Sequence, residues 1–208
     1  GMCYPGFEQL VVNWFPPYLQ VVTYDVDLRS SDRQSISTLF DEVQIAEGLV
    51  LQTRQGRKIS NEILFGEVPG EHVTNELGQK YWVKLLDNQN VGLFLDMGHV
   101  RRWLAPKVKN RKVLNLFAYT CVFSVSALVN GARSVVNVDM SKNSIEWGKE
   151  NHKINDLDLR MTSMLSSNVF RSWRKIKQLG RYGVIIIDPP TNQRGSFNAE
   201  KHYGQILK

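Results

Sequence analysis

Two acidic residues, Asp139 and Asp188, each end a short apolar stretch, where a carboxylate could accept hydrogen bonds from a ligand. Asp139 closes "SVVNVD", and Asp188 closes "GVIIID" just before Pro189 and Pro190. Asp139 comes 19 positions after Thr120, a spacing that suits both hydroxyls of a ribose. The alternative for Asp139 is structural, as the N-cap of the helix that follows.

The loop that precedes this acid in the pattern, Ala118 to Ser124, contains no glycine. Dinucleotide-binding folds carry a glycine-rich loop there, because glycines let the backbone close around a pyrophosphate. The missing glycines argue against a dinucleotide, whereas Asp139 still favours a ribose. A ribose without a pyrophosphate indicates S-adenosylmethionine as the cofactor.

These residues need a sheet that brings the ends of several strands together. In the second half of the chain, apolar strands alternate with helical segments, which is typical of a parallel, doubly wound α/β sheet. We expect strands at 112–119, 134–139, 159–165 and 182–188, and helices at 122–130, 141–155 and 168–180. Ligands bind beyond the carboxyl ends of such strands, so residues 115–120, Asp139, 166–170 and Asp188 should line one crevice.

The first half of the chain predicts a small α+β domain. We expect strands at 7–15, 19–27, 48–54 and 80–87, a helix at 35–47, and a polar loop around Gly56, Gly66, Pro69 and Gly70. The predicted organisation is a small domain at 1–90, a linker that closes over the cofactor at 91–111, and a Rossmann-like domain at 112–208.

The net charge of +6 is unevenly distributed along the chain. Residues 1–100 carry 7 Lys/Arg against 13 Asp/Glu (net −6), and residues 101–208 carry 19 against 7 (net +12). A basic second half predicts a polyanionic partner, and a merely solvated surface is the alternative. The residues expected to contact this partner are Arg101, Arg102, Lys107, Lys109, Arg171, Arg174 and Lys175. For Trp103, Trp147 and Trp173, packing against a helix face is favoured over base stacking.

The composition is that of a globular chain, with 42% hydrophobic and 22% charged residues. No apolar run approaches the roughly 20 residues that span a bilayer, so we expect no membrane contact and a cytoplasmic protein. The two cysteines, Cys3 and Cys121, are too few for a disulfide framework or a metal cluster, and no metal site is predicted.

Four segments of the sequence resemble a known family: "VGLFLDM" (91–97), "VLNLFAYT" (113–120), "GARSVVNVDMSKNSIEWGKENHKIN" (131–155) and "IIIDPPT" (185–191). They look like the class I methyltransferases that modify bases of large-subunit ribosomal RNA, and in particular like the guanine-N7 and cytosine-C5 enzymes. The resemblance implies an S-adenosylmethionine-dependent RNA methyltransferase whose partner is ribosomal RNA or a precursor ribosomal particle.

The resemblance also implies roles for individual residues. Together with the strand ends, it assigns cofactor binding to Phe94, Asp96, Asn115, Phe117, Tyr119, Thr120, Ser124, Asp139, Met140, Asn168, Val169, Phe170 and Asp188. Among them, Asp139 would hold the ribose and Asn168 would read the adenine edge. Asp188, Pro189 and Pro190 would form the catalytic floor between the cofactor and the target base.

The choice of target atom follows from the nucleophiles available. A cytosine-C5 enzyme needs a cysteine nucleophile, and neither Cys3 nor Cys121 is near Asp188 in the sequence. Guanine N7 has an available lone pair and needs no such group. We therefore favour guanine N7, with an exocyclic amine as the second choice.

The chain departs from the family's pattern at Val122, Gly98 and Asn192, where glycine, arginine and an aromatic residue are usual. Two alternatives therefore stay open: a non-catalytic relative that binds RNA, and a methyltransferase for a small molecule or a protein. The family's sheet has seven strands and this sequence predicts the first four. The strand at 182–188 is thus expected at an exposed edge, where it could pair with a second copy.

Overall fold

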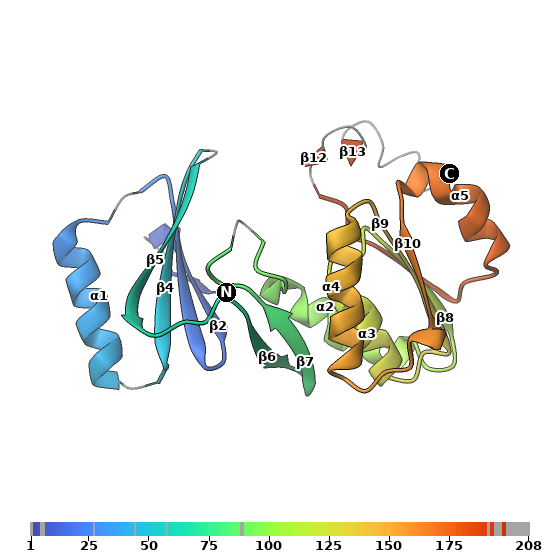
Figure 1. Ribbon diagram of the computed structural model, residues 1–208, viewed down its shortest axis with the longest axis horizontal. Coiled ribbons are helices and arrows are strands. Elements are labelled where there is room, and N and C mark those ends of the chain that lie inside the picture. The colour runs from blue at the N-terminus through green and yellow to red at the C-terminus, as the bar shows by residue number, and fades with distance from the viewer. Residues whose placement is uncertain are drawn as a thin grey trace. The chain divides into compact units, whose positions relative to one another are not determined.

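A computed structural model of the chain (Figure 1) describes residues 2–4, 7–26, 28–43, 45–56, 58–87, 90–190, 192–193 and 197–198. The chain divides into two compact units, Gly1–Gly98 and His99–Lys208. The segment 91–111, expected to be a linker, is therefore divided between the two units. No helix in the described part of the chain is long and apolar enough to cross a membrane.

The first unit is built on a five-stranded sheet with the order β1-β2-β3-β4-β5. Its strands are β1 (Met2–Tyr4), β2 (Phe7–Phe15), β3 (Tyr18–Tyr24), β4 (Gly48–Gln55) and β5 (Lys58–Gly66). The helix α1 (Ser30–Val43) connects β3 to β4, which are parallel, and packs Ile36 and Phe40 against one face of the sheet. A separate hairpin consists of β6 (His72–Glu76) and β7 (Gln79–Val83).

Two expectations for this unit are corrected. The helix expected at 35–47 begins at Ser30, because the Asp32 carboxylate in its first turn accepts a hydrogen bond from the Arg29 N–H (3.1 Å). The polar stretch 58–66, expected to be a loop, is the antiparallel edge strand β5. Its polar side chains face solvent, and a turn with Gly56 at φ 57° joins it to β4.

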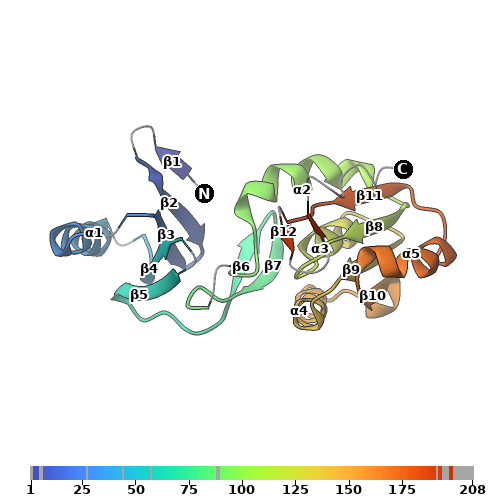
Figure 2. The same cartoon turned by 90° about the horizontal axis from the view of Figure 1, so that it is seen from above.

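The second unit contains a parallel four-stranded sheet with the order β10-β9-β8-β11, which confirms the predicted doubly wound α/β fold (Figure 2). Its strands are β8 (Lys112–Leu116), β9 (Ser134–Asp139), β10 (Thr162–Ser166) and β11 (Val184–Ile187), and its main helices are α3 (Val122–Val129), α4 (Lys142–Lys153) and α5 (Val169–Gln178). The short helix η1 (Leu95–Met97) ends the first unit, and α2 (Gly98–Leu104) begins at the boundary. The other short elements of the second unit are η2 (Ala105–Lys107), η3 (Leu159–Met161), β12 (Asn192–Gln193) and β13 (Phe197–Asn198).

The register of the parallel strands aligns their carboxyl ends. Leu116 of β8 pairs with Val138 of β9 and with Ile187 of β11, while Asp139 pairs with Ser166 of β10. The residues that follow these positions must therefore gather at one edge of the sheet, as expected for a ligand site.

The two faces of this sheet have different partners. One face packs against α5 in a cluster that includes Leu116, Val136, Val169 and Ile176. The opposite face packs against α3 and α4, because successive strand side chains alternate between faces. In the described residues, β11 pairs only with β8, and its Ile185 is 55% exposed.

Candidate functional site

Asp139 lies at the carboxyl end of β9, and its carboxylate organises the surrounding backbone. Oδ2 accepts a hydrogen bond from the Tyr119 N–H (2.9 Å), and Oδ1 accepts one from the Ser141 N–H (2.8 Å). The side chain is only partly buried. Each carboxylate oxygen has a further lone pair with which to accept a ribose hydroxyl. The N-cap alternative for Asp139 is wrong, because Ser141 caps α4 by accepting from the Ser144 N–H (3.1 Å).

The loop after β8 turns without glycine because three of its residues adopt the left-handed backbone conformation. Phe117, Tyr119 and Cys121 have φ values of 58°, 46° and 59°. This conformation costs a non-glycine residue about 1–2 kcal/mol, so it persists only where the surroundings fix it. No residue type in this loop predicts the left-handed conformation, because glycine is the residue that normally adopts it.

Hydrogen bonds from neighbouring elements fix this strained loop. The Ala118 N–H donates to the Val138 carbonyl (3.0 Å), and the Asn151 side-chain amide donates to the Thr120 carbonyl (2.9 Å). The Cys121 N–H closes the loop on the Ala118 carbonyl (2.8 Å). The loop is therefore held by hydrogen bonds from β9 and from α4.

Three residues expected to contact the cofactor have fully buried side chains, at 0–1% exposure: Asn115, Thr120 and Ser124. These side chains are therefore buried within the protein, and their assignment to cofactor binding stays a prediction. Asn115 points to the covered face of β8, and Ser124 lies in the fully buried first turns of α3. Val122, whose side chain could have crowded the cofactor, is likewise buried in α3, at 7% exposure.

A chain of buried hydrogen bonds links Asn115 and Ser124 to α4. The His152 Nδ1–H donates to the Gly148 carbonyl (2.6 Å), so Nε2 accepts from the Ser124 hydroxyl (2.9 Å). The Ser124 Oγ accepts from the Asn137 amide (3.0 Å), whose Oδ1 accepts from the Asn115 amide (2.9 Å). Burial lowers the pKa of His152, which favours this neutral imidazole.

His152 and Asn151 were not predicted as functional residues, although the sequence of α4 carries a signal for them. Ile145, Gly148, Asn151 and His152 recur at helical spacing and are all buried. Polar residues on the apolar face of a helix need partners inside the protein. Here the partners are the Ser124 hydroxyl and the carbonyl of the ligand loop.

Gly148 allows α4 to approach this loop closely. A Cβ atom at this position would lie 2.5 Å from the Cys121 Sγ and 2.9 Å from its Cβ. Cys121 is 0% exposed, and burial raises the pKa of its thiol, with the charge of Asp139 adding to the effect. Cys121 therefore packs the loop against α4 and is not a reactive thiolate.

The residues expected around the adenine fall into two groups. Met140 and Phe170 are exposed at the carboxyl edge (39% and 38%), and the Asn168 amide nitrogen lies 3.7 Å from the Met140 sulfur. The Asn168 Oδ1 caps α5 by accepting from the Phe170 N–H (2.9 Å). The Val169 side chain is 4% exposed and packs in the core with Leu116, and the expected contact of this residue with adenine stays a prediction.

The remaining predicted residues lie at the end of β11 and in the other unit. Asp188 directly follows Ile187, the partner of Leu116, and so lies beside the start of the ligand loop, with Pro189 and Pro190 after it. The side chain of Asn192 lies outside the described residues. Phe94 and Asp96 are exposed residues of the first unit, so their contact with the cofactor remains a prediction.

Most of the predicted basic residues lie on the surface of the second unit, but Arg101 does not. Its side chain is 2% exposed, with the guanidinium 5.6 Å from the centroid of the Phe123 ring, so its assignment to an RNA-binding surface is wrong. The long aliphatic stem of arginine packs as an apolar group. The exposed members of the predicted set are Arg102, Lys107, Lys109, Arg171, Arg174 and Lys175.

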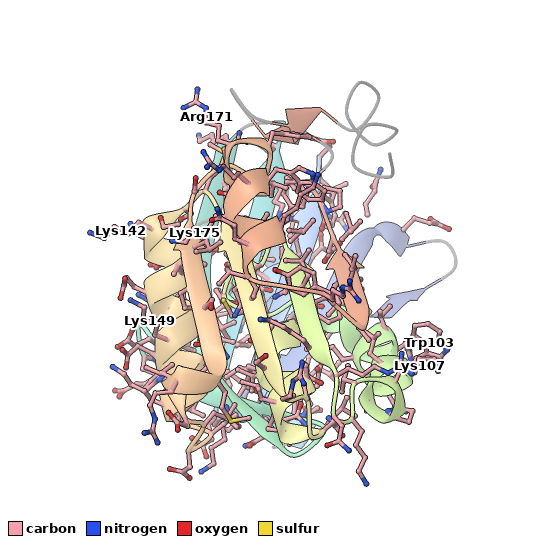
Figure 3. The ribbon with its side chains drawn as sticks, turned by 90° about the vertical axis from the view of Figure 1, so that its right-hand side faces the viewer. Trp103, Lys107, Lys142, Lys149, Arg171 and Lys175 are labelled. Atoms are coloured by element: carbon pink, nitrogen blue, oxygen red, sulfur yellow. The ribbon has the colours of Figure 1, made fainter. Side chains whose placement is uncertain are left out.

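Figure 3 shows where the outward-pointing cations lie. Arg171 and Lys175 project from α5, and Lys142 and Lys149, which the sequence analysis did not single out, project from α4. Trp103 is 61% exposed, with the Lys107 ammonium 4.1 Å from its ring centroid, so the expectation that Trp103 packs against a helix is wrong.

Comparisons with known proteins identify the family of the chain. A family described as S-adenosylmethionine-dependent methyltransferases matches residues 1–208. Ribosomal RNA large subunit methyltransferase I of Aeromonas hydrophila is 34% identical over 193 residues, which are 89% of this chain and 49% of that protein. Ribosomal RNA large subunit methyltransferase K/L of a Psychrobacter species is 36% identical over 143 residues, 65% of this chain and 18% of that protein.

Among solved structures, SMU.776, a proposed methyltransferase in complex with S-adenosylhomocysteine (SAH), is 26% identical with a TM-score of 0.85. The likeness covers 97% of this chain and 53% of that one. The chain thus spans about half the length, or less, of the curated relatives named above. The match over its whole length shows that the chain belongs to the S-adenosylmethionine-dependent methyltransferase family.

Proposed function

We propose that this chain binds S-adenosylmethionine at the carboxyl edge of the parallel sheet and methylates a base of large-subunit ribosomal RNA, with guanine N7 as the favoured atom. The observation that carries the proposal is the carboxylate of Asp139. It is partly exposed at the end of β9, is held rigidly by the Tyr119 and Ser141 N–H groups, and retains acceptor capacity for two hydroxyls.

The residues at this edge fit the cofactor. Asp139 would hold the ribose, while the exposed thioether of Met140 and the ring of Phe170 would offer apolar surface to the adenine. The Asn168 amide nitrogen lies next to Met140 and could donate to an adenine nitrogen. The pre-formed loop from Phe117 to Cys121 offers side chains where a dinucleotide site offers glycines.

The chemistry asked of the protein is modest, because the cofactor supplies both the methyl group and its own leaving group. The residues around the site would orient the two reactants and exclude water. Cys121 is buried with a raised pKa, so it does not supply the nucleophile that cytosine-C5 chemistry requires. Guanine N7 needs no nucleophile from the protein, which supports it as the target atom.

The charge of the second unit supports an RNA substrate. Lys142 opens α4 and Arg171 lies in the first turn of α5, and both helices begin just after the strand ends that border the proposed cofactor site. Cations at these positions would contact phosphates on either side of an unpaired base. The names of the relatives, which specify ribosomal RNA, agree with this substrate class.

Three finer points belong to the same proposal. The substrate could be a precursor ribosomal particle, and a ribosomal substrate implies that the protein acts in the cytoplasm. The third point is a dimer.

The outer edge of β11 has no strand partner in the described residues, and Ile185 is exposed there, which suits pairing with a second copy. Light scattering tests the last point: Ile185→Lys should abolish dimers of the wild-type chain, and a wild-type monomer at all concentrations would contradict it.

Calorimetry with S-adenosylmethionine and SAH tests the cofactor site. We expect micromolar binding that Asp139→Ala abolishes. The matched control is Asp158→Ala, because Asp158 also accepts a local backbone hydrogen bond, from the Arg160 N–H (2.9 Å), but lies away from the strand ends. Equal losses in both variants, or no binding by the wild type, would refute the proposal.

The target atom requires a separate assay. Transcribed fragments of large-subunit ribosomal RNA would be incubated with the protein and labelled S-adenosylmethionine. The position of the label would then be mapped by reduction and cleavage of the RNA strand at N7-methylguanine. Label on a cytosine or an exocyclic amine would contradict guanine N7 and leave the methyltransferase proposal standing. Label on protein instead of RNA would refute the RNA substrate.

A further inference from the structure

The first unit contains a cavity whose lining shares only Phe94 and Asp96 with the residues predicted to bind the cofactor. It measures about 380 Å³ and lies between the face of the sheet opposite α1 and the segment from Asn90 to Asp96. Its lining includes Asn13 and Gln20 from β2 and β3, with Tyr24 and Arg54 beyond them. A volume in this range is typical of sites for small molecules, and it is large enough for a base with its ribose.

The floor of this cavity carries an unsatisfied hydrogen-bond donor. Gln20 is 1% exposed, and its Oε1 accepts from the Asn13 amide (3.2 Å). Its Nε2 has no partner in the part of the chain that the structure describes. A buried donor left unpaired costs about 1–3 kcal/mol, so such a group in a cavity points to a ligand that accepts the missing hydrogen bond.

Aromatic rings and an arginine line the same cavity. Phe94 is 45% exposed and Tyr24 is 39% exposed. The Arg54 guanidinium lies 5.3 Å from the centroid of the Tyr24 ring and donates to Gln52 Oε1 (2.7 Å). Rings and guanidinium planes are the surfaces on which proteins stack unpaired bases.

Charge argues that the ligand is recognised by its ring and not by a polyphosphate. Asp96 also lines the cavity, and residues 1–100 have a net charge of −6. In the lining, the Asp96 carboxylate balances the Arg54 guanidinium, so no excess of cations is present to hold a di- or triphosphate, whereas a base presented by an RNA strand has only a flanking phosphate to accommodate. The neutral amides of Asn13 and Gln20 suit the mixed donor and acceptor edge of a base.

We infer that this cavity binds an unpaired nucleobase of the RNA substrate, stacked on Phe94 or Tyr24 and accepting a hydrogen bond from Gln20 Nε2. The inference rests on the proposed function, since it takes RNA as the substrate. The cavity thereby gives the acidic first unit a role in substrate recognition that its charge alone would not predict.

Nuclear magnetic resonance of the full chain, labelled with ¹⁵N, tests the inference. The four nucleoside 5′-monophosphates are titrated in turn, with ribose 5-phosphate as the ligand that lacks a base. We expect the side-chain amide signals of Gln20 and Asn13 to shift with at least one nucleotide and not with ribose 5-phosphate. No shift with any nucleotide, or an equal shift with ribose 5-phosphate, would overturn the inference.

Two variants check the contacts. Phe94→Leu removes the stacking surface and should raise the Kd for the nucleotide roughly 5- to 150-fold. Gln20→Met removes the donor and should also weaken binding. The matched control is Trp14→Leu, because Trp14 is exposed (43%) on the same sheet but is not among the residues that line the cavity. If Phe94→Leu weakens binding no more than Trp14→Leu does, the inferred stacking is wrong.

The calorimetry described above separates this inference from the proposed function. Cofactor binding without base binding would overturn the inference alone. Base binding without cofactor binding would support the cavity and count against the methyltransferase proposal.

Discussion

Gly148→Ala should disable the cofactor site while leaving the fold intact. The new Cβ would lie 2.5 Å from the Cys121 Sγ, whereas atoms in contact are separated by about 3.5 Å, so the loop must move by about 1 Å. Overpacking of this kind lowers the free energy of unfolding by about 1–3 kcal/mol, and the higher helix propensity of alanine raises it by about 1 kcal/mol. The net loss of stability is therefore about 0–2 kcal/mol, too little to unfold a domain of ordinary stability.

The effect on ligand binding should be larger than the effect on stability. A shift of about 1 Å would lengthen the 2.9 Å hydrogen bond from the Tyr119 N–H to Asp139 beyond bonding distance. A hydrogen bond to a charged group contributes about 1.5–3 kcal/mol, so the affinity for SAH should fall at least tenfold. Urea denaturation and calorimetry on the same sample measure the two quantities.

A second substitution makes this prediction specific. Cys121→Gly removes both clashing atoms and suits the φ of 59°, so the double variant should recover most of the lost affinity. The control is Gly70→Ala, where an added Cβ meets nothing within 4 Å. If Gly148→Ala binds SAH as tightly as the wild type and is more stable, the loop yields to the new methyl group, and the argument that Gly148 positions it is refuted.

Three further predictions concern pH, capping and charge. Because burial lowers the folded-state pKa of His152, the unfolded chain binds more protons below the ordinary value of about 6.5. The contribution of the neutral His152 side chain to the free energy of unfolding should be complete above about pH 7. Below pH 6.5 it should fall by up to about 1.4 kcal/mol per pH unit. Urea titrations should show this slope in the wild type and a weaker one in His152→Gln. Asn168→Ala should lose about 1 kcal/mol through the missing cap of α5, and Asn168→Asp should lose nothing; equal melting temperatures for both would contradict the capping role. Arg171→Ala should lower the slope of log K for RNA binding against log salt concentration by about one, without changing stability. Arg101→Ala should lower the stability and leave that slope unchanged, because its side chain is buried. An equal change of slope in both variants would show that Arg101 reaches the RNA.

The parallel sheet could be predicted because its signals are local and redundant. Each strand of the second unit is a short apolar run, and each helix ends or begins with a recognisable residue, such as Ser141. Asp139, Met140 and Asp188 could be assigned to one edge because the ends of parallel strands must meet there. By contrast, β5 was missed because Ser60, Asn61 and Glu62 interrupt its apolar residues, so it lacks a regular alternation of polar and apolar side chains.

Side-chain direction was harder to predict than position. Asn115 lies on the strand that leads into the site, but its side chain is buried on the α3 side of the sheet, and the sequence of this five-residue strand does not show which face each side chain takes. Arg101 stands in a basic run, yet its neighbours in space are Phe123 and the apolar side of α3. Both errors arise because burial depends on contacts between segments far apart in the chain.

The three left-handed residues of the ligand loop also bear on how such a site could diversify. A glycine loop presents bare backbone, so its selectivity is limited to the shape of the main chain. Tyr119 instead presents a partly exposed side chain from a backbone position that the turn fixes in advance, while Phe117 packs partly against the core. Substitution of Tyr119 could alter which group is accepted without redesigning the turn, and little conformational entropy would be lost when a ligand arrives. Such a loop exchanges intrinsic stability for a recognition surface that single mutations can tune.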